Sequence, residues 1–168
     1  MIEIRRAEPG DEVALCTIRR SAILELTAET MSPSQALLWA NGAAPDRVAQ
    51  AIARHAVWVA IETVQVGWVE VDEDRVAGLY VAPHSAGRGI GLLLLRHAEA
   101  AILDGGYTAA WLETSPNALN FYLRSGYGLR ATNGDSGAPL LCKRFSEPNS
   151  NCAPHGATPR LPPRPDSR

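Results

Sequence analysis

Apolar positions along the chain follow two spacings, one typical of strands and one typical of helices. Alternation with a period of two, or a short β-branched run, predicts strands at residues 2–6, 57–61, 66–71, 75–81, 109–113, 127–131 and 139–145. Spacings of three and four predict helices that begin near Pro9 and Asp11, at Ser32-Pro33 and at Asp46, and further helices at residues 90–103 and 117–125. This order of strands and helices predicts a mixed α/β fold with helices on the faces of one sheet.

Several of these segments carry more detailed expectations. The first helix is expected to present an apolar face made of Val13, Ala14, Ile18, Ile23 and Leu24. Asp46 is expected to cap the third helix. Residues 57–61 and 66–71 are close enough in sequence to form a hairpin, and the last two strands can form a second, closing hairpin.

The composition changes abruptly at residue 146. Six of the chain's twelve prolines lie between residues 146 and 168, among Ser, Asn, Arg and Gly, with almost no large apolar side chain. Such a segment cannot bury enough surface to offset the entropy lost on ordering. We therefore expect one folded domain at residues 1–145 and a disordered Pro-rich tail at residues 146–168.

Charge and cysteine content narrow the class of protein. The net charge is −2, which gives no field to attract nucleic acid or an anionic membrane surface, and no apolar run has the length of a bilayer crossing. The three cysteines, Cys16, Cys142 and Cys152, are far apart, which argues against a disulfide framework and a zinc site. We expect a cytoplasmic protein without a metal.

A glycine-rich turn between a strand and a helix carries the clearest chemistry. The strand ends in Leu79-Tyr80-Val81, and the sequence AGRGIG follows at residues 86–91, where the next helix begins. The first amides of a helix lack intrahelical partners and glycines allow close approach, so such a turn can bind a phosphate or pyrophosphate. A P-loop would need Lys and then Ser or Thr after Gly91, where this chain has two leucines. A dinucleotide fingerprint would need Gly in place of Leu92, so neither motif is present.

The turn resembles the pyrophosphate loop of the GNAT (GCN5-related N-acetyltransferase) superfamily, whose pattern is [QR]-x-x-G-x-[GA]. Residues 115–127, SPNALNFYLRSGY, are similar to that family's second signature, A-x-x-F-Y-x-x-x-G-[FY]. The resemblance covers residues 1–145 and implies a central, mostly antiparallel sheet of six to seven strands flanked by helices. The chain departs from the pattern at Ala86, where the family usually has Gln or Arg, and Arg88 could supply the missing charge.

The resemblance also implies an activity, the transfer of an acetyl group from acetyl-coenzyme A to an amine by direct attack in a ternary complex. Tyr122 is the implied acid that protonates the departing sulfur, although a Tyr packed on a helix is an alternative role. Asn117 corresponds to a polar cofactor contact and equally suits a helix N-cap. The residues implied in cofactor binding are Leu79, Tyr80, Val81, Ala86, Gly87, Arg88, Gly89, Ile90, Gly91, Asn117 and Tyr122.

The general base and the acceptor are not identified by the sequence. Glu113 is the favoured base because its strand ends beside the helix predicted at residues 117–125. Glu62, Glu70 and Asp72 are expected to be solvated carboxylates. A water relay in place of a single base is an equal alternative. The fold implies an acceptor cleft built from residues 20–45 and 127–145, with Trp39 as an aromatic wall. The acceptor is a small-molecule amine or a peptide amine, and dimerisation is left open.

Two other functions stay open at this point. A GNAT-fold protein could bind acyl-coenzyme A, or act as a regulator, without turnover, and Ala86 is compatible with that role. Residues 134–142, GDSGAPLLC, look like the nucleophile segment of chymotrypsin-like proteases and would make Ser136 a nucleophile. That second alternative conflicts with the long helix predicted at residues 90–103, because the protease fold is all-β.

Overall fold

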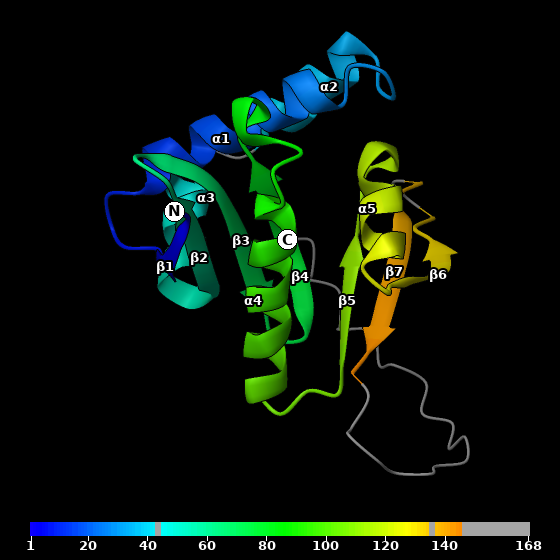
Figure 1. The fold of residues 1–168 in the computed structure, drawn as a ribbon. Helices are drawn as coiled ribbons and strands as arrows, with labels where there is room; N and C mark the ends of the chain where they lie inside the picture. The colour runs from blue at the N-terminus through cyan, green and yellow to red at the C-terminus, as the bar shows by residue number, and fades with distance from the viewer. Residues whose placement is uncertain (43–44, 135–136, 146–168) are drawn as a thin grey trace, which may run out of the picture.

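Seven strands form one twisted sheet at the centre of the protein (Figure 1). The computed structural model describes residues 1–42, 45–134 and 137–145. The strand order is β1-β2-β3-β4-β5-β7-β6, and all neighbours are antiparallel except β4 and β5. The strands are β1 (Glu3–Arg6), β2 (Ala56–Ile61), β3 (Gln65–Asp72), β4 (Arg75–Val81), β5 (Ala109–Glu113), β6 (Gly128–Thr132) and β7 (Pro139–Arg144). The mixed, mostly antiparallel sheet and both predicted hairpins are confirmed.

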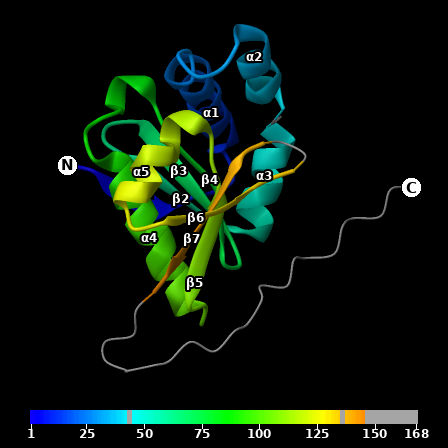
Figure 2. The same ribbon diagram turned by 90° about the vertical axis from the view of Figure 1, so that its right-hand side faces the viewer.

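Helices cover both faces of the sheet, as the side view shows (Figure 2). The helices are α1 (Glu12–Leu26), α2 (Pro33–Asn41), α3 (Pro45–Arg54), α4 (Ile90–Asp104) and α5 (Leu119–Arg124), and two 3₁₀ turns are η1 (Pro83–Ser85) and η2 (Pro116–Ala118). The first three lie on one face, and α4 and α5 lie on the other. The sheet is therefore the middle layer of a three-layer structure.

The helix ends show where local sequence signals succeed and fail. Ser32 forms the expected start of α2, since its hydroxyl accepts from the Gln35 amide and the Gln35 side chain accepts from the Ser32 amide. The cap predicted at Asp46 is wrong, because α3 already begins at Pro45 and Asp46 lies in its first turn. The predicted apolar face of α1 is wrong at Val13, which is 68% exposed, whereas Leu15 is fully buried.

The two largest apolar cores of the described residues lie on opposite faces of the sheet. The larger one, between the sheet and α4, includes Ile90, Leu94, Leu95 and Ile102 together with Val69 and Leu112 from the strands. The smaller one, on the other face, joins Leu15 and Ile18 of α1 to Val48 of α3 and to Trp68 of β3. Strand β3 is thus buried between the two cores, whereas its neighbour β4, which leads into the glycine-rich turn, is partly buried along most of its length.

Two expectations from the sequence concern residues that the structure does not describe, and a third concerns membrane-spanning helices. The tail at residues 146–168 and the Ser136 of the protease-like segment are not among the residues that the structure describes. Within residues 1–42, 45–134 and 137–145, no helix has the length and apolar character of a bilayer crossing.

Candidate active site

A row of unpaired backbone amides lies where the glycine-rich turn becomes α4. The Ala86 amide donates to the Pro83 carbonyl oxygen at 3.1 Å, and the next amide along the described chain that donates to a backbone carbonyl belongs to Leu93, which bonds the Gly89 carbonyl oxygen at 3.1 Å. The amides of Gly87 to Leu92 make no such bond. Because they gather at the positive end of a 15-residue helix, they form a suitable site for an anion.

Gly87 and Gly89 give this turn its shape. Their φ angles are +75° and +82°, in the left-handed region that other residues rarely adopt. A Cβ atom added at either position would meet no heavy atom within 4 Å, so the space in front of the turn is open. The glycines therefore serve both the backbone conformation and close approach of a ligand.

Strand β4 presents a free backbone edge beside this turn. The Ala82 amide donates to the Val66 carbonyl oxygen at 2.8 Å, so Tyr80 and Ala82 direct their amides towards β3. Leu79 and Val81 consequently direct theirs the other way, towards β5. Strand β5 pairs with β4 only at Arg75 and Trp111 among the described residues, and the two strands part beyond that point (Figure 1).

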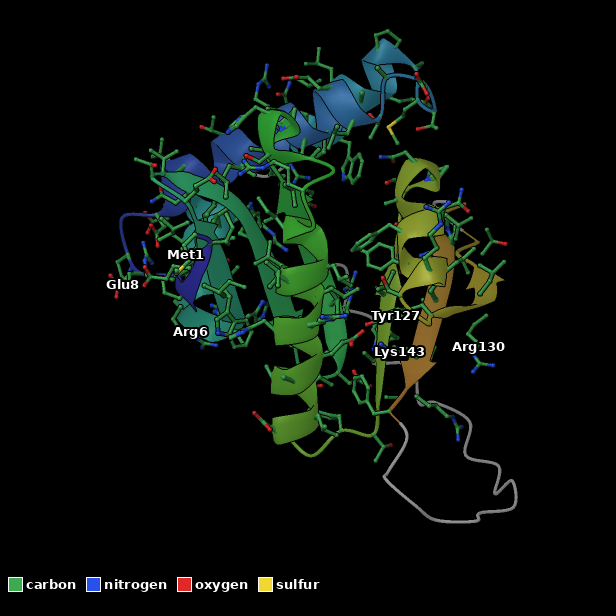
Figure 3. All side chains as sticks on the ribbon, viewed as in Figure 1. Met1, Arg6, Glu8, Tyr127, Arg130 and Lys143 are labelled. Atoms are coloured by element: carbon green, nitrogen blue, oxygen red, sulfur yellow. The ribbon has the colours of Figure 1, made fainter. Side chains whose placement is uncertain are left out.

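The two halves of the sheet remain joined through α4. The Lys143 ammonium of β7 contacts both carboxylate oxygens of Glu99 at 2.9 Å, and it lies 5.7 Å from the ring centre of Tyr127. Figure 3 shows Tyr127 and Lys143 side by side between α4 and β7. These contacts hold β7, and through it β5, at a fixed position relative to α4.

Tyr122 lies on α5, in the part of the larger core that faces this parting of the strands. Its residue is 7% exposed, and its ring packs edge-on against Phe121 and Tyr127, at 4.9 Å and 5.8 Å between ring centres. Burial raises the pKa of the Tyr122 phenol well above its ordinary value, and the nearby Tyr80 phenol raises it further. Tyr122 thus holds its proton throughout the neutral range, which is the protonation state that a proton donor needs.

Arg88 and Ala86 occupy the exposed side of the turn. The Arg88 guanidinium binds the Glu62 carboxylate in a two-pronged ion pair, with N–O distances of 3.0 Å and 2.6 Å. Glu62 belongs to the turn between β2 and β3, so this pair links that turn to the start of α4. An acidic partner thus already binds Arg88 in this structure, and the role of Arg88 in cofactor binding stays a prediction.

Asn117 does not cap a helix, so that part of its prediction is wrong. It lies inside η2, and its side-chain amide donates to the Leu26 carbonyl oxygen at the end of α1, at 3.1 Å. A capping side chain would instead accept from a backbone amide. Asn117 therefore connects η2, the 3₁₀ turn before α5, to the end of α1.

The four candidate carboxylates differ widely in their surroundings. Glu113 is exposed at the end of β5, where it accepts from the Asn133 side chain at 3.1 Å. Glu70 is 1% exposed, which contradicts the expectation of a solvated group. Its carboxylate accepts from Arg47 at 2.7 Å and 3.4 Å and meets the Nδ1 atom of His55 at 2.7 Å.

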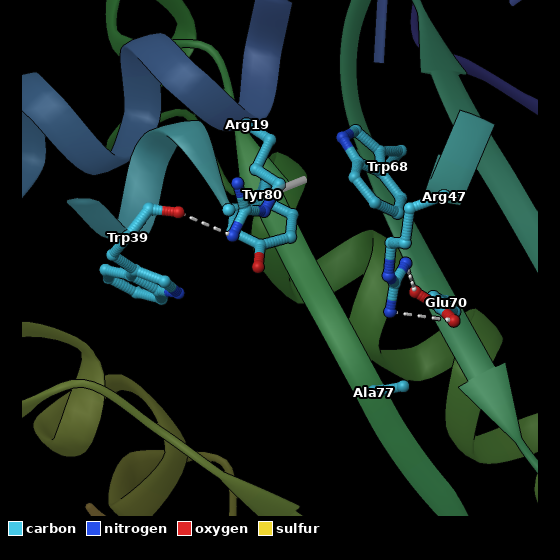
Figure 4. A pocket seen from close by; sticks show the side chains of 8 residues that line it. Arg19, Trp39, Arg47, Trp68, Glu70, Ala77 and Tyr80 are labelled. Carbon is cyan, nitrogen blue, oxygen red and sulfur yellow. Dashed lines mark hydrogen bonds and ion pairs between the residues drawn. The ribbon is translucent and has the colours of Figure 1, made fainter. Parts of the chain in front are cut away.

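Glu70 is part of the wall of a pocket on the face of the sheet that carries α1, α2 and α3 (Figure 4). The pocket has a volume of about 200 Å³. Its lining consists of Arg19, Trp39, Gly42, Arg47, Trp68, Glu70, Ala77 and Tyr80. Trp39 thus lines a pocket as expected, but the closing hairpin at residues 127–145 contributes none of these residues.

Sequence reasoning missed the two arginines of this pocket and the burial of Glu70. Arg19, Arg47 and Glu70 come from three separate elements, so no local motif contains them. One signal was available for Arg19, which follows Leu15 and Ile18 on the buried stripe of α1. A charged residue on such a stripe needs a polar partner.

Within the described residues, no group of three or more His, Cys, Asp or Glu side chains could hold a metal ion.

Comparison with known proteins agrees with this geometry. A family model described as the acetyltransferase (GNAT) domain matches residues 53–128, which contain β4, the glycine-rich turn, α4 and α5. A GCN5-related N-acetyltransferase of Rhodopseudomonas palustris, also described as an aminotransferase of class II, superposes with a TM-score of 0.79. The two are 24% identical, and the match covers 85% of this chain and 95% of that one. Residues 53–128 of the chain thus match the GNAT acetyltransferase domain, and the whole described fold is the one seen in GNAT proteins.

Two other proteins resemble this chain. The PaiA N-acetyltransferase of Thermoplasma acidophilum, solved in complex with coenzyme A, has a TM-score of 0.77 at 21% identity, over 86% of this chain and 99% of that one. The uncharacterized N-acetyltransferase YafP of Escherichia coli is 34% identical over 96 residues, or 56% of this chain. That alignment spans 63% of YafP, less than two thirds of its length.

Proposed function

We propose that this protein is a GNAT N-acetyltransferase that moves the acetyl group of acetyl-coenzyme A to an amine by direct attack in a ternary complex. The observation that carries the proposal is the row of unpaired amides from Gly87 to Leu92 beside the free edge of β4. A diphosphate and an extended amide-containing arm would both find partners there. The coenzyme A complex of the PaiA protein supports the same ligand.

The residues present fit coenzyme A in two ways. Gly87 and Gly89 leave open space in front of amides that have no other backbone acceptor, which suits the diphosphate. The amides and carbonyls of Leu79 and Val81 that face the parted strand suit the pantetheine arm, which would add to β4 like another strand. Asn117 stands at the opposite side of this space, on the segment that precedes α5.

Acetyl-coenzyme A supplies the acetyl thioester. An amide on the free edge of β4, at Leu79 or Val81, donates to the thioester carbonyl oxygen and polarises it for attack. As the amine nitrogen bonds to the carbonyl carbon and the carbon–sulfur bond breaks, Tyr122 gives its phenolic proton to the sulfur. The proton lost by the amine passes to solvent, from which Tyr122 is reprotonated.

Replacement of Tyr122 by Phe tests the role of its proton. We expect kcat to fall roughly a hundredfold or more, the usual contribution of a general acid, while the Kd for coenzyme A stays unchanged. Tyr127→Phe is the matched control, because Tyr127 is buried in the same core and its ring packs against that of Tyr122. Equal kcat values for the two variants would remove Tyr122 from the mechanism.

A pair of glycine substitutions tests the anion site. Gly89 immediately precedes α4 and Gly106 follows it, and their φ angles are +82° and +88°. A Cβ atom added at either position would have no other heavy atom within 4 Å. Ala at either position should cost roughly 1–2 kcal/mol of stability through backbone strain. Only Gly89→Ala should weaken coenzyme A binding, by about tenfold or more, as expected for the loss of a hydrogen bond to a charged group. Calorimetric titration that shows equal affinity in both variants would refute the site.

The alternative of a coenzyme A-binding protein without turnover has one observation in its favour. The usual Gln or Arg is absent at position 86, and Arg88 is held by Glu62, so the turn offers no free side-chain cation. Assays of the wild-type protein distinguish the two functions. Release of free thiol with any member of an amine panel supports the transferase, while coenzyme A binding without any release supports the alternative.

A further inference from the structure

The pocket on the α1–α3 face contains a buried guanidinium without a carboxylate partner. Arg19 is 8% exposed, and it donates to the carbonyl oxygens of Ala40 and Trp39, both at 3.0 Å. Within the described residues it forms no ion pair. Its remaining contact is with the face of the Tyr80 ring, 5.6 Å from the ring centre (Figure 4). A buried Arg usually has an anionic partner, so this arrangement is one that an anionic ligand would complete.

The other charges of the pocket leave a positive excess. Glu70 is its only acidic lining residue among those described, and it is already satisfied by Arg47 and by His55. Arg47 uses two of its five N–H donors on Glu70, and its side chain is 49% exposed, so further donors remain. Arg19 likewise keeps donors beyond the two that bind carbonyls. The pocket can thus accept an additional anion.

Size and walls restrict what that anion is attached to. A volume of about 200 Å³ lies below the roughly 300–1,000 Å³ typical of sites for drug-sized molecules. Trp39, Trp68 and Tyr80 supply aromatic walls, and the Trp68 and Tyr80 rings lie 5.1 Å apart. The Trp68 indole nitrogen is occupied by the Leu15 carbonyl oxygen at 3.0 Å, so it offers apolar surface rather than a donor.

The pocket also adjoins the reacting centre inferred above. Tyr80 lies in its wall, and the Tyr80 phenol is close enough to Tyr122 to affect that group electrostatically. The neighbours of Tyr80 on β4, Leu79 and Val81, carry the free backbone edge. A small molecule held by its anionic end among the guanidinium groups could therefore extend an amine towards that edge.

We propose that this pocket binds the carboxylate of the acceptor, so that the substrate is a small primary amine that also carries a carboxylate, such as a free amino acid with an apolar side chain. This inference rests on the proposed acetyl transfer. The forked guanidinium groups of Arg19 and Arg47 match a carboxylate in shape and charge, and Trp39 and Tyr80 contact the apolar part of the molecule.

The test compares amines that differ only by the carboxylate. The pairs are phenylalanine with phenethylamine and leucine with isopentylamine, and phosphoethanolamine with ethanolamine checks whether a phosphate takes the same place. Free thiol release gives kcat/KM for each compound. We expect the amino acids to be preferred by roughly tenfold to a hundredfold, the contribution of a hydrogen bond to a charged group.

Arg47→Gln then locates the preference. This variant should lower the ratio of the two kcat/KM values by about tenfold, because one cation is lost and Glu70 then repels an anion. The ratio is measured within one sample, so partial unfolding of the variant does not affect it. Arg54→Gln is the control, since Arg54 is exposed on the same helix and does not line the pocket.

Calorimetry with the same pairs, in the presence of coenzyme A, separates this inference from the proposed function. Preferential binding of amino acids without any acetylation would support the anion site and refute the transfer. Acetylation with no preference for the carboxylate, an unchanged ratio in Arg47→Gln, or a preference found only for the phosphate would overturn the inference. Binding of neither member of a pair would overturn it as well.

Discussion

Asp11 provides a sharp test of how the face that carries the pocket is held together. Its carboxylate accepts two bonds from the Arg5 guanidinium, at 2.8 Å and 3.0 Å, and one from the Glu8 amide at 2.9 Å. The Gln65 side chain donates a further bond at 3.0 Å. Asp11 thus ties β1 to the start of α1, which carries Arg19, and to the first residue of β3. The informative perturbation is Asp11→Asn, which keeps the shape and removes the charge.

The magnitude follows from the pKa of this carboxyl group. The bond from Arg5 is the main cause that lowers the pKa of Asp11 from 3.8 to about 2, against the opposing effect of burial. Each pKa unit corresponds to about 1.4 kcal/mol, so the charged form contributes about 2.4 kcal/mol to folding at neutral pH. Because the folded pKa is depressed, this contribution is complete above about pH 4 to 5 and is lost as the pH falls through about 2. At pH 3 roughly half of it remains.

Urea unfolding of the wild type and of Asp11→Asn at pH 7 and pH 3 measures this directly. We expect the variant to lose about 2 kcal/mol of unfolding free energy at pH 7 and about half as much at pH 3. Glu12→Gln is the control, since the neighbouring Glu12 accepts from the Gly10 amide and forms no ion pair in the described residues. A loss at pH 3 as large as that at pH 7 would show that the charge of Asp11 is not the origin of its effect.

Two further predictions concern the elements that shape the pocket. A Cβ atom at Gly67 would lie 2.9 Å from the Tyr80 carbonyl oxygen, so Gly67→Ala should cost about 1–3 kcal/mol by thermal unfolding, whereas Gly128→Ala, with no atom nearer than 3.9 Å, should cost less than half as much. Arg19→Met should remove the side-chain donor to the Ala40 carbonyl oxygen and one of the two donors to the Trp39 carbonyl oxygen, cost about 1–3 kcal/mol and speed hydrogen exchange in α2. Arg54→Met, on the exposed surface of α3, should leave that exchange unchanged, and equal exchange in both variants would exclude the role of Arg19.

The sequence-based predictions were accurate for features that depend on residues a few positions apart in the chain, and less accurate for features that depend on packing. The bounds of β4 and β5 were predicted to the residue, and the start of α4 followed from the glycine-rich turn, because turn glycines and hydrophobic periodicity act within a few residues. The cap at Asp46 and the exposed Val13 show the limits of the same signals. Pro45 already suits the first turn of a helix, and α1 packs on the sheet through a stripe centred on Leu15 rather than on Val13.

The sequence by itself determined the order of strands and helices, the amide-rich turn at residues 86–91, and the position of Tyr122 on the helix that follows β5. Each of these depends on backbone preferences and on neighbours within one or two helical turns. Only the tertiary structure decided that Glu70 is buried, that Arg88 pairs with Glu62, and that Arg19 lacks an acidic partner. These properties depend on side chains that meet over separations of 21 to 26 residues, such as Arg47 with Glu70, and a charge that is solvated in an isolated segment becomes buried only when another element packs over it.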